Sequence, residues 1–127
     1  MAGAPEPRGR RYPRTRRITR GSEIRALFKR GKRSRTPHLD VLVAASPGSF
    51  SRVGIVVPRH GHSAVERNRV KRRLREALRQ EILPRLDGGS ARVDLLVRAR
   101  REAYGAPYAA LAGELLSWVD ARWPVSS

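Results

Sequence analysis

The sequence predicts an α+β fold in which helices pack on a small sheet, and two kinds of apolar spacing support this prediction. Helical spacing occurs over 63–83 and 107–122, whereas strand-like runs occur over 38–45, 53–57 and 93–97. The chain has 127 residues, enough for one domain with a modest core. Since the patterns alternate without an internal repeat, we expect a single sandwich of helices on a sheet.

The segment from Ser63 to about Leu83 carries the clearest helix signal. Ser63 and Glu66 match the Ser-x-x-Glu capping box, in which each side chain satisfies a free backbone donor of the other residue. One apolar face follows at helical spacing: Val70, Leu74, Ala77, Leu78 and Ile82. We expect the helix to end by Leu83, before Pro84.

The first half of this helix is cationic. Six of the nine residues 67–75 are Arg or Lys, and such neighbours repel one another. Arg67 and Lys71 fall within the apolar sector, where an unpaired charge is costly to bury. We therefore expect the first two turns to protrude from the core and to face an anionic partner. A merely solvated charged face is the alternative.

Composition favours nucleic acid as that partner. Lys and Arg number 28 against 11 Asp and Glu, giving a formal charge of +17 and a pI near 11.8. An anionic membrane is the rival, but no apolar run approaches the roughly 18 residues of a membrane span. Cysteine is absent, which excludes disulfides and thiolate metal sites. The N-terminus lacks an apolar signal segment, so we expect a cytoplasmic protein.

The remaining elements are predicted from shorter signals. Ile24, Leu27 and Phe28 fit a short helix that ends at Gly31. In the strand 38–45, alternation places two sets of side chains on opposite faces: Leu39, Val41 and Val43 against His38, Asp40 and Leu42. We expect strand 53–57 to pair with strand 38–45 as a hairpin. A further strand near 32–36 is compatible with the sequence but not indicated by it.

The order of these motifs resembles that of the bacterial ribonuclease P protein component. The string Arg67-Asn68-Arg69-Val70-Lys71-Arg72-x-Leu74-Arg75, with Ala64 before it, is similar to the Arg-Asn-Arg helix of that family. Arg17-Ile18 with Ile24, Phe28, Lys29 and Gly31 resembles its first helix, and 53–57 and 93–98 resemble the strands on either side of the motif. The resemblance spans about residues 17–122.

This resemblance implies a fold and a division of the chain. The implied fold is a single-domain αβββαβα sandwich over residues 17–123, like the second domain of ribosomal protein S5. A left-handed βαβ crossover belongs to it, which periodicity alone does not reveal. A disordered basic arm over 1–16 precedes this domain, and a tail over 124–127 follows it.

The resemblance also implies a function. The protein would be the subunit of ribonuclease P that binds the catalytic RNA and the 5′ leader of precursor tRNA. It would thereby assist the endonucleolytic cut that gives the mature tRNA 5′ end. Catalysis would belong to the RNA subunit, which requires Mg²⁺, with no catalytic residue, metal site or bound cofactor in the protein. The implied assembly is one protein monomer with one RNA.

Site residues carry over by position. The residues implied to dock on the catalytic RNA, here called the docking set, are Arg67, Asn68, Arg69, Lys71, Arg72 and Arg75. The residues implied to line a leader-binding cleft, here called the cleft set, are Ile24, Phe28, His38, Asp40, Leu42, Arg59 and His60. Ile24 and Leu42 stand where the family often has aromatic residues, so less stacking is available to leader bases. Gly61 and Ser63 also depart from the family pattern, which affects the metal-assisted contacts expected of that loop.

Several alternatives remain at this stage. A general RNA-binding or ribosomal-type protein without a leader-binding role is the main one. Intrinsic nuclease activity is disfavoured because the eleven acids are scattered and do not suggest a two-metal site. Phe28 is either a core residue or part of the cleft, and Arg98 lies either on RNA or in a solvated loop. His38 and Asp40 are expected to share a strand face as a local charge balance.

Overall fold

Among the described residues of the computed structural model, 13–59 and 61–123, the elements follow the predicted order αβββαβα. The predictions for residues 1–12 and 124–127 lie outside this range. In chain order the elements are η2 (Arg14–Arg16), α1 (Gly21–Arg30), β1 (Lys32–Arg35), β2 (Leu39–Ala45), β3 (Arg52–Val56), α2 (Ala64–Ala77), η3 (Leu78–Ile82), α3 (Leu83–Gly88), β4 (Val93–Ala99), η4 (Arg101–Gly105) and α4 (Tyr108–Arg122).

The sheet has the strand order β1-β2-β4-β3. β2 pairs antiparallel with both β1 and β4, whereas β3 pairs in parallel with β4. The predicted hairpin between 38–45 and 53–57 is therefore wrong, because β4 lies between these two strands. The reason is burial: the first five residues of β4 are all buried, and a strand that is apolar on both faces belongs inside the sheet.

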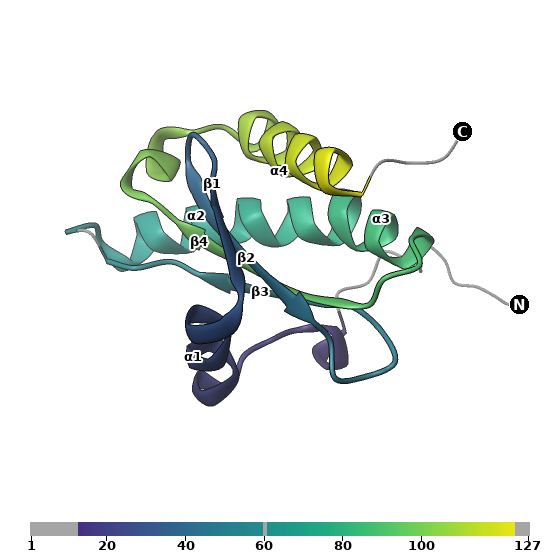
Figure 1. The fold of residues 1–127 in the computed structure, drawn as a ribbon. Coiled ribbons are helices and arrows are strands. Elements are labelled where there is room, and N and C mark those ends of the chain that lie inside the picture. Colours follow the sequence, from purple (N-terminus) through teal and green to yellow (C-terminus); the bar gives the residue numbers. More distant parts are fainter. Residues whose placement is uncertain (1–12, 60, 124–127) are drawn as a thin grey trace, which may run out of the picture.

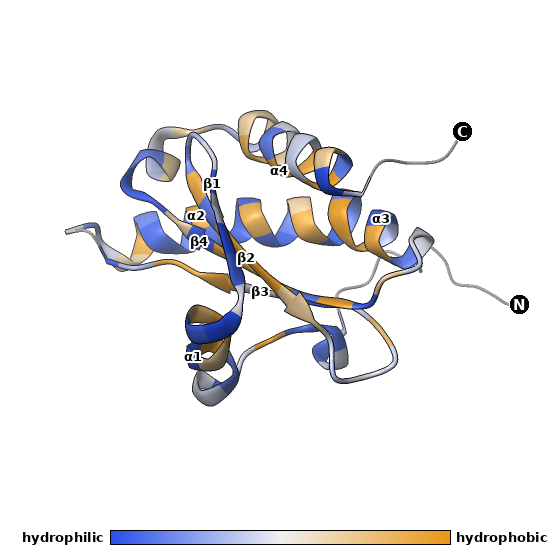
Figure 2. Ribbon diagram, viewed as in Figure 1, coloured by the Kyte–Doolittle hydropathy of each residue, from blue (hydrophilic) through white to orange (hydrophobic). Residues whose placement is uncertain are grey.

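Two hydrophobic clusters occupy opposite faces of the sheet. α2, α3 and α4 cover one face and α1 covers the other (Figure 1). Leu39, Val41 and Val43 point into the larger cluster, while Leu42 packs beneath α1 in the smaller one, as the alternation predicts. In Figure 2 the strands at the centre of the sheet are coloured largely as hydrophobic, whereas the helices alternate between hydrophobic and hydrophilic residues.

The chain before α1 is part of the fold, although residues 1–16 are predicted as an arm. Arg14–Arg16 form a 3₁₀ turn, and the Arg16 Nε donates to the Ser51 carbonyl oxygen at 2.7 Å. The Ile18 N–H then bonds to the Val53 oxygen at 2.8 Å. Gly54 permits this close passage, since a Cβ there would lie 2.9 Å from the Ile18 oxygen. Residues 14–16 of the predicted arm thus contact the domain.

The capped helix is longer than predicted. Ser63 and Glu66 form the expected reciprocal capping box. The helix does not end at Leu83, however, because η3 is a π-helical turn that leads directly into α3. Pro84 then stands in the first turn of α3, where its missing N–H is not needed. The helical path therefore continues to Gly88.

An ion-pair network joins α1 to the sheet. Arg52 of β3 binds Asp94 of β4 through two bonds, of 3.0 and 2.7 Å, and reaches Glu23 of α1 at 3.1 Å. The Asp94 carboxylate is the main cause of the raised pKa of Arg52. Asp94 is only 4% exposed, and the ion pair with Arg52 compensates for its burial.

We predict that Asp94→Ala lowers the free energy of unfolding by about 3 kcal/mol, because it leaves Arg52 without its buried partner. Glu23→Gln is the matched control and should cost less than about 1 kcal/mol, since Glu23 is more exposed. Urea unfolding with an unchanged m-value measures both. Equal effects of the two variants would contradict the assigned role of Asp94.

Candidate nucleic-acid interface

The docking set lies on the first three turns of α2. Val70 and Leu74 face the core, whereas Asn68, Arg69, Arg72 and Arg75 are exposed. The described residues place no carboxylate within 4.0 Å of any cation of the docking set. Arginines elsewhere in the fold, such as Arg52, do have such partners. The docking set is therefore an unneutralised cationic surface.

Most of the first two turns of α2 lie outside the core, as predicted: Ala64, Val65, Glu66, Asn68 and Arg69 are exposed, and Val70 is the first buried residue. η4 contacts α2, and Arg67 is half-buried beside Tyr104. The Nε of Arg67 is buried and has no hydrogen-bond partner among the described residues. The aliphatic stems of arginine and lysine can pack against neighbouring side chains while the charged groups extend toward solvent. This explains how Arg67 and Lys71 can both be half-buried.

A cavity of about 200 Å³ connects the docking set to α1. Its basic lining comes from Arg17, Lys71 and Arg75, and its apolar lining includes Ile24 of the cleft set. The docking and cleft sets therefore meet at one place, although they are predicted as separate surfaces. From the sequence, Arg17 is assigned only to the region of the first helix. Its position beside α2 cannot be predicted, because the two segments are about 50 residues apart in the chain.

Phe28 lies at the outer edge of the space between α1 and the sheet. Its side chain is 37% exposed, so it is not a core residue. The guanidinium groups of Arg33 and Arg98 lie 5.9 and 5.7 Å from its ring centroid, within cation–π range. Arg33 belongs to β1, a strand that the sequence did not indicate. An exposed ring flanked by two arginines is suited to stack a base beside a phosphate.

The other members of the cleft set differ in accessibility. Ile24 is half-buried against the smaller cluster, and Leu42 is 1% exposed beneath α1. Leu42 therefore supports α1 from below and presents no surface. Asp40 is buried with Arg35 3.7 Å away, and Arg59 is exposed. His60 lies outside the described residues.

His38 and Asp40 do not share a strand face, which corrects the prediction. His38 precedes β2, and its Nδ1 lies 2.7 Å from Glu114 of α4, on the opposite side of the sheet from α1. The same carboxylate accepts from the His38 N–H and the Thr36 hydroxyl. His38 thus helps to attach the β1–β2 connection to α4 and lies away from Phe28.

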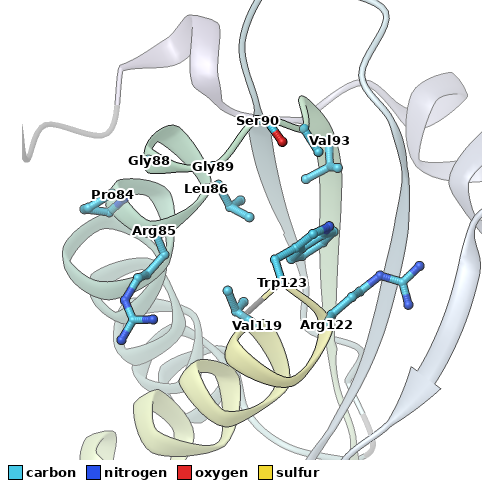
Figure 3. A pocket seen from close by; sticks show the side chains of 11 residues that line it. Pro84, Arg85, Leu86, Gly88, Gly89, Ser90, Val93, Val119, Arg122 and Trp123 are labelled. Carbon is cyan, nitrogen blue, oxygen red and sulfur yellow. The ribbon is translucent and has the colours of Figure 1, made fainter. Parts of the chain in front are cut away.

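A second cavity, of about 570 Å³, lies at the other end of the long helix (Figure 3). Leu86, Val119 and Trp123 form much of its wall, with Arg122 at its edge. Leu86 is 17 residues beyond Arg69 on the same helical path, or about 25 Å. No member of the docking or cleft sets lines this cavity.

The described residues contain no group of three His, Cys, Asp or Glu side chains placed to hold a metal ion. Within residues 13–59 and 61–123, no helix has the length and apolar character needed to cross a membrane.

The fold and the unneutralised α2 surface define a class of protein: a small, basic α+β protein with a surface suited to a polyanion. A profile of the Ribonuclease P family matches residues 12–121. The ribonuclease P protein component of Desulfovibrio desulfuricans is 43% identical over 115 residues, covering 84% of each chain. That of Kocuria rhizophila is 36% identical over 107 residues, covering 84% of this chain and 91% of the relative.

Solved structures agree with this fold. The Staphylococcus aureus RNase P protein superposes with a TM-score of 0.72 at 21% identity, covering 85% of this chain and 95% of that one. The Thermotoga maritima RNase P protein gives 0.69 at 24% identity, with coverages of 87% and 98%. The chain belongs to the bacterial ribonuclease P protein component family. It is thus the protein component of an endoribonuclease of tRNA processing, with the RNA subunit as its implied partner.

We predict that the start of α2 loosens in acid. The Ser63 backbone N–H, followed by His62, holds the pKa of Glu66 below its ordinary value of 4.5. Because the folded-state pKa is lowered, the capping contribution is present above pH 4.5 and is lost as pH falls through the lowered pKa. The protection factors of the amides at 64–67, measured against intrinsic exchange at each pH, should fall over that range. Glu66→Gln, which cannot ionise, should remove this pH dependence; a persisting transition would contradict the assignment.

Proposed function

We propose that this protein binds the catalytic RNA of ribonuclease P through the docking set on α2. The observation that carries the proposal is the unneutralised cationic surface of Arg67, Arg69, Lys71, Arg72 and Arg75. A phosphate backbone supplies the missing anions and releases its own counterions on binding. Asn68 lies among these cations and adds a side-chain amide that hydrogen-bonds to either phosphate or base.

The same proposal assigns the 5′ leader of precursor tRNA to the space beside α1. Phe28, Arg33 and Arg98 supply one exposed ring and two cations for a single-stranded segment. Base stacking on an aromatic side chain contributes about 1–3 kcal/mol per base. Because Ile24 and buried Leu42 offer no ring, we expect Phe28 to be the main stacking residue. The cavity lined by Arg17, Lys71 and Arg75 continues this path to α2.

In this assembly the RNA subunit performs the cleavage with Mg²⁺, and one protein binds one RNA. The chain's own side chains reduce the repulsion between two RNA backbones and position the leader. Both effects raise substrate affinity without any protein group acting on the scissile bond.

We predict that the protein stimulates cleavage of precursor tRNA by its cognate catalytic RNA at low Mg²⁺. Phe28→Ala should weaken binding of precursor tRNA to the holoenzyme at least fivefold, since it removes a stacking surface. The affinity of the Phe28→Ala protein for the catalytic RNA, measured without precursor tRNA, should not change. Absence of stimulation by the unaltered protein would favour a general RNA-binding role, and cleavage without the RNA subunit would refute the division of labour.

We predict a steep salt dependence for binding to the catalytic RNA. Five to ten phosphate contacts give a log–log slope of roughly −4 to −9. Arg69→Ala should weaken binding and reduce the magnitude of the log–log slope by about 1, the value expected for the loss of one phosphate contact. Arg122→Ala, which removes an exposed arginine at the end of α4, is the charge-matched control and should leave both values unchanged. A slope near zero for the unaltered protein would exclude electrostatic docking.

A further inference from the structure

We propose that His62 and Tyr104 are positioning residues that hold the start of α2 in its RNA-binding conformation before the RNA arrives. The inference rests on the proposed docking role of α2 and assigns a function to two residues outside the docking and cleft sets. His62 lies in the connection from β3 to α2, and Tyr104 lies in η4, which follows β4. Both side chains are only half-buried, and Tyr104 packs at the edge of the larger hydrophobic cluster.

The two rings form a close parallel stack. Their centroids are 3.8 Å apart and the planes differ by 8°. The Tyr104 hydroxyl also donates to the backbone oxygen of Pro58, two residues after β3 ends. Tyr104 therefore holds the connection at two points, one soon after β3 and one just before α2. η4 also contacts α2.

Contacts on the other side of His62 join it to the helix. Its backbone N–H bonds to the Arg59 oxygen at 2.7 Å, and its Nδ1 lies 3.2 Å from the Glu66 carboxylate. Gly61 enters this turn with φ of 81°, a conformation that glycine adopts without strain. Glu66 is also a member of the capping box. The His62 ring is thus linked on one side to the cap of α2 and on the other to Tyr104.

The start of α2 needs such support. The first buried residue of this helix is Val70, so 64–69 contribute no fully buried side chain. Several like charges follow at once, and their repulsion favours fraying of this turn. If the turn were frayed, binding would have to order it. Fixing the backbone of a single residue in advance is worth roughly tenfold in affinity.

The test compares alanine variants with variants that keep the stack. Tyr104→Ala and His62→Ala should each weaken binding of the full chain to the catalytic RNA by about five- to tenfold. His62→Phe keeps an aromatic ring but cannot pair with Glu66, and it should recover most of the affinity. Tyr104→Phe keeps the stack and loses only the bond to Pro58, so its loss should be smaller than that of Tyr104→Ala.

Two further readouts separate positioning from other roles. The salt slope should stay unchanged in all four variants, because no phosphate contact is removed. Amide exchange should accelerate at 64–67 in the alanine variants, while β4 amides and the Tm stay near those of the unaltered protein. If the magnitude of the salt slope fell by about 1, these residues would contact RNA phosphate directly, and the proposal would be overturned.

The remaining outcomes also decide the matter. Unchanged affinity in both alanine variants overturns the positioning role even if the amides at 64–67 exchange faster. A parallel fall in Tm and in β4 protection would make the stack a general stability element and likewise overturn it. Failure of the unaltered protein to bind the catalytic RNA would instead refute the proposed function itself, and the two failures are therefore distinguishable.

Discussion

The burial of β4 on both faces determines where the rest of the chain can lie. Its residues contribute to both hydrophobic clusters, with Leu95 and Val97 in the larger and Leu96 in the smaller. Helices must cover both sides of such a strand. α2 and α4 take one face, while α1 takes the other and leaves Phe28 at its edge. The docking surface and the proposed leader path are thus two consequences of one buried strand.

Charge is the second constraint, and the fold distributes its few acids in a particular way. Asp94 and Glu23 hold Arg52, Asp87 holds Arg16, and acids elsewhere pair with arginines remote from the start of α2. Most of these pairs join elements that are distant in sequence, whereas Glu76 and Arg79 are three residues apart on one helical path. Many of the acids are therefore engaged in contacts within the fold, whereas the described residues place no carboxylate within 4.0 Å of the docking set.

Sequence reasoning succeeded where the physical signal is local. The Ser63–Glu66 box depends on residues three apart, and the alternation of β2 depends on neighbours two apart, so both were predicted correctly. The predictions for Pro84 and His38 were wrong, because in both cases the surrounding structure overrides the local rule. Pro84 does not end the helix, because it follows a π-helical turn and stands in the first turn of α3, where proline is tolerated. His38 does not lie on the same strand face as Asp40, because it precedes β2 and binds Glu114 of α4.

The sequence by itself determined the family, the order of elements and the cationic helix that carries the docking set, because all three depend on short-range spacing and composition. The tertiary structure decided which strands pair and which residues meet beside α1. β3 joins β4 across α2, and Arg17, Arg33 and Arg98 converge on the two sets from distant parts of the chain. Such proximity arises from burial of a shared core, which no local pattern encodes.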